Sequence, residues 1–369
     1  MTYAASGFAI GYWKFFPTPQ KDWGLVPVWG FAEVVESTSD VVSVGERFYG
    51  FYPLASELVM QPVAHGGNAV RDVARHRVDL PAVYNIYTRA SSAPKASDPY
   101  QALMQPLIAT SYLLYDWLMD NEWFEARQIV IGSASSKTGL GLTAFLANHV
   151  DKPFEIVGLT SKRNADFVDE LGFCDQVVTY DDVEALDQVV SVYVDMAGNG
   201  DVKQRLHARL DGHLKHSVAV GISHWDQFAP QIEVAGPKPE FFFAPSQIEK
   251  RKKDWGKGVI EQKIGEATQM IVQDATRWLS LETHNGLEAA MTPYAVLASG
   301  KANPKTGHVV EVKLVGVTRS QGMAAVLAAA AAKQWPIECR LWAVRVGGQE
   351  GRGWAISFAR LLYDVIIAL

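Results

Sequence analysis

The sequence predicts an α/β fold in which a doubly wound parallel sheet is joined to a smaller β-rich unit. Between residues 127 and 223, short apolar segments alternate with amphipathic segments, which is the pattern of a parallel sheet with crossover helices. Before residue 62, segments rich in valine and aromatic residues are interrupted by proline and glycine, which favours strands over helices. A length of 369 residues suggests two domains.

The composition is that of an ordinary globular protein, with 48% hydrophobic and 20% charged residues. A net charge of −6 gives no indication of a nucleic-acid partner. The two cysteines, Cys174 and Cys339, cannot form a four-thiolate structural zinc site. Neither a secretory signal nor an apolar stretch long enough to span a membrane is visible, so we expect a cytoplasmic protein without a membrane partner.

The N-terminal part predicts strands within residues 26–37 and 42–54. Residues 63–100, which include a run of mixed charge at 71–79, predict a loop-rich connector on the surface. The apolar segment that follows has the spacing and length of a helix, and we expect that helix over residues 101–124.

From residue 127 the expected order is strand, turn and helix, repeated. We expect strands ending at Ile131 and over 154–160, 176–182, 189–196 and 216–223, with helices over 161–172 and 201–212. The charged KRKK cluster of segment 246–258 predicts a solvated helix face. Beyond it we expect helices over 259–280 and 287–299, a strand over 306–314, and a tail without a familiar pattern over 315–369.

The turn IVIGSASSKTGLG, residues 129–141, is the strongest indication of function. A strand leads through small residues into a helix near Gly139, and the free N–H groups of a helix start bind a diphosphate well. The candidate cofactor-binding residues here are Ser133, Ser135, Ser136, Lys137, Thr138 and Gly139. Two alternatives stay open: an ordinary strand–helix connection, and a P-loop, because Ser-Lys-Thr echoes the end of that motif one residue short of its spacing.

The second strand of this region ends in Thr160-Ser161-Lys162-Arg163. Sites that prefer NAD carry an acidic residue at this point, whereas hydroxyls and cations suit a 2′-phosphate. We therefore expect NADP(H) as the cofactor, the alternative being a solvated helix start. Gly198 and Gly221, near the ends of two later strands, complete the candidate cofactor-binding set.

Five segments in order resemble the medium-chain dehydrogenase/reductase superfamily over about residues 1–313: VPVWGFAEVVESTSDVVSVGERFYGF, QPLIATSYLLYDWL, GSASSKTGLGLTAFLA, VYVDMAGNGDVKQRLHARL and AMTPYAVLASGKANPKTGHVVEV. GYWKFFP, LPAVYNIYTR and FFFAPSQIEKRKKDWG are most similar to one uncharacterised branch, the DUF2855 family, which supplies no known substrate. The resemblance implies a Rossmann-type doubly wound sheet domain beside a partial GroES-like β-rich domain.

It also implies a domain plan. Residues 1–100 and about 285–314 would form the GroES-like catalytic domain, apparently truncated at its N-terminal side, and residues 101–284 the nucleotide-binding domain, leaving 315–369 as a tail. Relatives often form dimers, so a homodimer is one expectation.

Gly30-Phe31-Ala32 stands where zinc-containing members carry Gly-His-Glu, and the histidines lack mutual metal-ligand spacing, so we expect no zinc or other metal.

Without zinc, hydride transfer requires a proton donor. Quinone-reductase-like members imply a tyrosine facing the substrate, with Tyr12 the first candidate and Tyr3 the second, although packing at the domain cleft is the alternative role. Tyr84 and Asn85 are expected to line the cleft and bind substrate, a structural role being the alternative. The sequence thus predicts a zinc-independent NADPH-dependent oxidoreductase that reduces a small carbonyl compound, quinone or activated alkene. The alternative is a non-catalytic nucleotide-binding sensor or scaffold.

Overall fold

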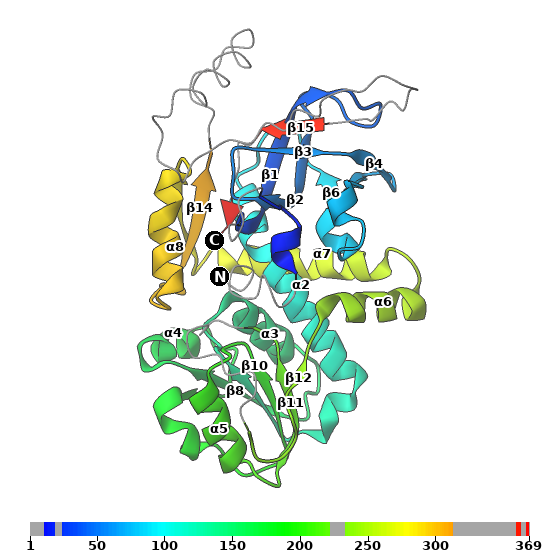
Figure 1. The fold of residues 1–369 in the computed structure, drawn as a ribbon. Coiled ribbons are helices and arrows are strands. Elements are labelled where there is room, and N and C mark those ends of the chain that lie inside the picture. The colour runs from blue at the N-terminus through cyan, green and yellow to red at the C-terminus, as the bar shows by residue number, and fades with distance from the viewer. Residues whose placement is uncertain (1–10, 19–23, 222–232, 313–358, 363–366, 369) are drawn as a thin grey trace.

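The computed structural model describes residues 11–18, 24–221 and 233–312, together with the backbone of two strands at 359–362 and 367–368. These residues form two sheets, each with its own helices (Figure 1). Helix α2, Asp98–Asp120, runs from the β-rich unit down along the six-stranded parallel sheet. No helix among the described residues is long and apolar enough to cross a bilayer.

One sheet has six parallel strands in the order β12-β11-β10-β7-β8-β9. In chain order this is 3-2-1-4-5-6, the strand order of the Rossmann fold. Its central strands are apolar on both faces, because helices cover both sides. The strands are β7 Gln128–Gly132, β8 Glu155–Thr160, β9 Gln176–Thr179, β10 Ser191–Asp195, β11 Leu214–Ala219 and β12 Glu240–Phe241. This topology confirms the predicted α/β fold class.

Successive side chains of β7 point to opposite faces of the sheet, and each face has its own hydrophobic core. Ile129 and Ile131 pack with Leu113 of α2, and Val130 packs on the opposite face with Leu206 of α5. The helices around the sheet are α3 Lys137–Ala147, α4 Ala165–Glu170, α5 Gly200–Arg209, α6 Ala244–Trp255 and α7 Val259–Ala275. Helix α8, Met291–Ala298, lies beside the other sheet (Figure 1).

The second sheet has ten strands, which pair antiparallel except for β13 and β14. Its main path is β13-β14-β16-β1-β2-β6-β5-β4, with β15 and β3 attached beside β1. The strands are β1 Pro27–Ser37, β2 Arg47–Pro53, β3 Glu57–Met60, β4 Pro62–His65, β5 Ala69–Asp72, β6 Ile86–Arg89, β13 Ser280–Asn285, β14 Thr306–Glu311, β15 Ala359–Leu362 and β16 Ile367–Ala368. Short 3₁₀ turns include η1 Tyr12–Lys14, η2 Arg75–Arg77, η3 Ala82–Asn85 and η5 Lys162–Asn164.

Three expectations about elements were wrong. The connector 63–100 carries strands β4, β5 and β6, because its charged run pairs internally instead of facing water: Arg77 is fully buried, with Nη1 2.6 Å from Asp72 Oδ2. The helix expected over 259–280 ends at Ala275, and the chain returns to the β-rich sheet as β13. The KRKK cluster is helical, but Arg251 is buried against α2 instead of solvated. Part of the tail forms β15 and β16.

Candidate nucleotide-binding site

The candidate site lies where the central parallel strands end. Gly132, the last residue of β7, pairs with Leu159 of β8 on one side and with Asp195 of β10 on the other. The connections that follow therefore start side by side at the carboxyl edge of the sheet. Because β8 and β10 continue the sheet in opposite directions from β7, this is the topological switch point at which Rossmann folds bind their ligands.

The turn after β7 holds the start of α3 close to the sheet. Ser133 has a left-handed φ of 55°, and the Ser136 hydroxyl accepts a 3.1 Å hydrogen bond from the amide of Gly139 as the helix N-cap. A Cβ at Gly139 would lie 2.6 Å from the carbonyl oxygen of Ser133, so the turn requires glycine there. The helix offers no acceptor to the amides of Lys137 and Thr138, which leaves them as donors at its positive end.

Side chains connect this turn to the end of β8. Ser135 Oγ accepts hydrogen bonds from Thr160 Oγ1 at 3.0 Å and from Asn164 Nδ2 at 3.1 Å. Ser135 and Thr160 are buried, so they fix the two loops relative to each other. Ser161 Oγ is also buried, but no hydrogen-bond partner for it is found among the described residues, and Lys162 beside it is exposed. The end of β8 thus has a hydroxyl without a partner among the described residues and, in Lys162, an exposed cation.

Lys137 and Arg163 both reach the chain segment that leads into β14. Lys137 Nζ donates to the carbonyl oxygen of Thr306 at 3.0 Å, and Arg163 donates to that of Gly300. Burial lowers the pKa of Lys137 to about 8. A P-loop lysine must reach the phosphates cradled by its turn. The contact to Thr306 directs Lys137 elsewhere, which argues against the P-loop alternative.

The loops after β10 and β11 complete the edge. Asp195 Oδ1 accepts hydrogen bonds from two amides of the following turn, including that of Gly198 at 2.8 Å, and Oδ2 lies 3.1 Å from Lys203 Nζ. Gly198 has a left-handed φ of 71°, and a Cβ at Gly221 would lie 2.9 Å from the carbonyl oxygen of Met196. No role for Lys203 could be predicted from the sequence, because a lysine on an amphipathic helix ordinarily faces water.

The residues predicted for catalysis and substrate binding lie in the β-rich unit. Tyr12 and Tyr84 share a 2.8 Å hydrogen bond between their hydroxyls, and Tyr12 is only 8% exposed, packed with Phe15 and Phe51. Burial raises the pKa of Tyr12, and the bond to Tyr84 partly offsets that rise. Asn85 is fully buried, and its amide donates to a backbone carbonyl. Tyr3 lies outside the described residues.

The fold and the glycine-containing turn define a protein with a Rossmann-type sheet and an attached β-rich unit. Residues 1–303 match the family described as "Protein of unknown function (DUF2855)". The chain belongs to that family, as its sequence predicted. No curated protein sequence matches it.

Solved structures with a similar arrangement include CurA from Vibrio vulnificus in complex with NADPH, at 13% identity and a TM-score of 0.45, covering 81% of this chain and 96% of that one. The quinone oxidoreductase from Coxiella burnetii has 19% identity and a TM-score of 0.46, covering 83% and 84%. The yhdH oxidoreductase from Salmonella enterica in complex with NADP has 13% identity and a TM-score of 0.44, covering 85% and 88%. Likenesses this distant establish neither a ligand nor an activity for this chain.

Proposed function

We propose that this protein is an NADP(H)-dependent oxidoreductase that reduces a small carbonyl compound, quinone or activated alkene. The observation that supports it most is the position of the turn at residues 133–139, at the switch point of a sheet with Rossmann strand order. Residues 160–163, Gly198 and Gly221 follow neighbouring strands on the same edge. The predicted cofactor-binding residues therefore occupy one continuous edge of the sheet.

The chemistry of this edge fits a phosphorylated dinucleotide. The amides of Lys137 and Thr138 at the start of α3 suit its diphosphate. The Ser161 hydroxyl and the exposed Lys162 suit a 2′-phosphate, and Arg163 joins them when it exchanges the Gly300 carbonyl for that phosphate. Residues 160–163 include no carboxylate to favour an unphosphorylated ribose.

The bound nicotinamide supplies the hydride, and the chain has to supply orientation and a proton. Burial keeps the Tyr12 phenol neutral, since its pKa is raised, and a neutral phenol donates a hydrogen bond to a developing oxyanion. Tyr84 holds the Tyr12 hydroxyl through their shared hydrogen bond. In Figure 1, η1, which carries Tyr12, lies on the side of the β-rich unit that faces the six-stranded sheet. We assign the proton donation to this pair.

A nucleotide-binding protein without catalysis is the second candidate. It is favoured by the low exposure of Tyr12, 8%, inside an aromatic cluster, because a proton donor must reach its substrate. The two functions share the nucleotide site and differ only in turnover.

The test of the nucleotide site is a fluorescence titration of the full chain with NADPH and with NADH. Arg163→Ala should weaken NADPH binding roughly tenfold or more, because a charge-assisted bond to the 2′-phosphate is lost, and leave NADH binding nearly unchanged. Arg277→Ala is the matched control, since the Arg277 side chain is 80% exposed and distant in sequence from the site.

Oxidation of NADPH in the presence of enones and quinones then separates the two candidates. Turnover that falls in Tyr12→Phe supports the reductase. Binding without turnover of any of these substrates supports the non-catalytic protein. If neither nucleotide binds the folded chain, the turn is an ordinary strand–helix connection and the oxidoreductase proposal fails.

A further inference from the structure

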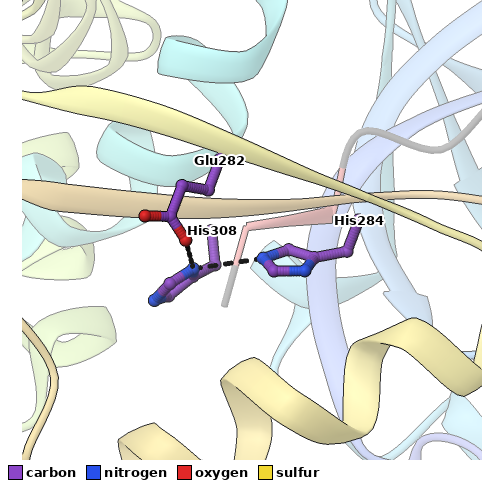
Figure 2. Close-up of side chains that lie close together, drawn as sticks. All are labelled: Glu282, His284 and His308. Carbon is purple, nitrogen blue, oxygen red and sulfur yellow. Dashed lines mark hydrogen bonds and ion pairs between the residues drawn. The ribbon is translucent and has the colours of Figure 1, made fainter.

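Two histidines and a glutamate converge on one face of the β-rich sheet, in a cluster made of Glu282, His284 and His308. Glu282 and His284 are two residues apart on β13, so their side chains project to the same face. His308 of the parallel strand β14 is the register partner of Glu282. Figure 2 shows the three side chains directed toward one another, with dashed lines from one nitrogen of the His308 ring to each of the other two.

The spacing of the three side chains is that of metal ligands. His284 Nε2 lies 3.2 Å from His308 Nδ1, which lies 3.5 Å from Glu282 Oε2. One ligand atom from each residue falls within 4.8 Å of the other two. Zinc bonds of about 2.0–2.1 Å in a tetrahedral site place neighbouring ligand atoms about 3.3 Å apart. Two of the three separations already match that value.

The same nitrogen, His308 Nδ1, faces both the imidazole of His284 and the carboxylate of Glu282. Without an ion, His284 and Glu282 both have to interact with the same nitrogen, His308 Nδ1, and compete for it. A cation at the centre gives each group its own bond. Two imidazoles and one carboxylate are a ligand set that zinc uses with a fourth position left open.

The cluster is accessible and electrostatically suited to a cation. Strand β13 is the edge of its sheet, and the Glu282 side chain is 59% exposed, whereas that of His308 is 10% exposed. A hydrated ion therefore enters from the open side and settles against a buried imidazole. Lys137, whose ammonium is held by the carbonyl of Thr306, is a cation near His308, and Glu282 supplies the negative charge of the cluster itself.

We propose that Glu282, His284 and His308 bind a divalent transition-metal ion of the zinc class, with three protein ligands and one open position. The ion joins β13 to β14 through side chains, in addition to their backbone ladder. The site is distinct from Gly30-Phe31-Ala32 on β1, where Phe31 and Ala32 are each 1% exposed and offer no ligand. It does not depend on the proposed reaction or on a bound nucleotide.

The test is a calorimetric titration of the chelator-treated full chain with Zn²⁺, and a parallel titration with Co²⁺ followed by its visible absorption. We expect one tight equivalent of Zn²⁺, a four-coordinate Co²⁺ spectrum, and a rise in the thermal midpoint on addition of Zn²⁺. Glu282→Gln keeps the size of an exposed side chain and should weaken Zn²⁺ binding at least tenfold. His284→Ala should abolish the Co²⁺ spectrum.

His65→Ala is the matched control, because His65 is an exposed histidine on strand β4 and stands outside the cluster. It should bind Zn²⁺ as the unaltered chain does. Circular dichroism of each variant without metal establishes that it is folded. The proposal is overturned if the folded chain binds no Zn²⁺, or if Glu282→Gln and His284→Ala bind it as tightly as the unaltered protein.

Discussion

At the scale of single residues, the β-rich unit contains a fully buried ion pair between Arg77 and Asp72. The guanidinium of Arg77 bonds Asp72 Oδ2 at 2.6 Å and the Tyr87 hydroxyl at 2.9 Å through Nη1, and the Tyr84 carbonyl at 3.1 Å through Nη2. The other carboxylate oxygen of Asp72 accepts two backbone amides, one of them Gln61 N at 3.0 Å. A charge removed from water this completely is tolerated only because its partners are in place.

Asp72→Asn is therefore expected to destabilise the protein by about 3–5 kcal/mol, since it leaves Arg77 buried without its counter-charge. The measurement is urea unfolding followed by circular dichroism. Glu170→Gln breaks the exposed pair with Lys305 and should cost at most about 1 kcal/mol. Equal losses in the two variants would show that Arg77 finds other partners, contrary to this account.

At the scale of elements, the nucleotide-binding turn is positioned by the contact of α3 with α2. Gly141 lets the two helices approach: a Cβ there would lie 2.6 Å from both Ile108 Cδ1 and Ser111 Oγ. Ser111 Oγ also donates to the carbonyl of Thr138 at 2.7 Å. The first turn of α3 is thus fixed by a close helix crossing as well as by its own cap.

Gly141→Ala should lower the free energy of unfolding by about 1–3 kcal/mol, because the added methyl overpacks the crossing. Gly265→Ala is the control: Gly265 lies inside α7 with nothing within 4 Å of the new Cβ, so the higher helix propensity of alanine should stabilise by up to about 1 kcal/mol. Opposite signs in denaturant unfolding are the expected result. A stable Gly141→Ala protein would mean that α2 and α3 separate without cost.

At the scale of the whole molecule, the two sheets are joined near the site by cationic side chains. Lys137 at the start of α3 donates to Thr306 of the β-rich sheet, and Arg163 donates to Gly300 in the segment before it. The same α3 start is the proposed place of the nucleotide diphosphate. The proposed nucleotide would therefore bind next to the contacts that join the two units.

The buried ammonium of Lys137 makes stability depend on pH. Its pKa is lowered by burial from 10.5 to about 8, so between these values the unfolded chain binds more protons than the folded one. The contribution of Lys137 to stability is therefore complete above about pH 10.5 and is lost as the pH falls to about 8. Relative to the unaltered protein, the Lys137→Met variant should gain the most stability at pH 7–8, and this gain should shrink toward pH 10. A difference that is flat in pH would contradict this assignment.

Local patterns predicted five of the six parallel strands, because each of those five contains a short apolar run, whereas β12 is two exposed residues that pair beside β11 and form no such pattern. The strands at β7, β8 and β10, the turn after β7 and the helix α2 all lie where the sequence placed them. The prediction of a surface loop over residues 63–100 is wrong, since the charge pattern does not reveal that Asp72 and Arg77 pair inside the protein. The end of the helix at 259–280 was misplaced for a similar reason: β13 exists only because β14 lies beside it.

The sequence by itself determined the fold class, the family and the turn on which the proposed nucleotide site rests, since strand and helix periodicity and turn chemistry are local properties of the chain. Only the tertiary structure decided which distant groups meet. His284 and His308 are 24 residues apart and show no metal-ligand spacing along the chain, yet parallel pairing of two strands sets their nitrogens 3.2 Å apart. Contacts across a sheet depend on register and strand order, which are set by the packing of the whole molecule and leave no local pattern in the sequence.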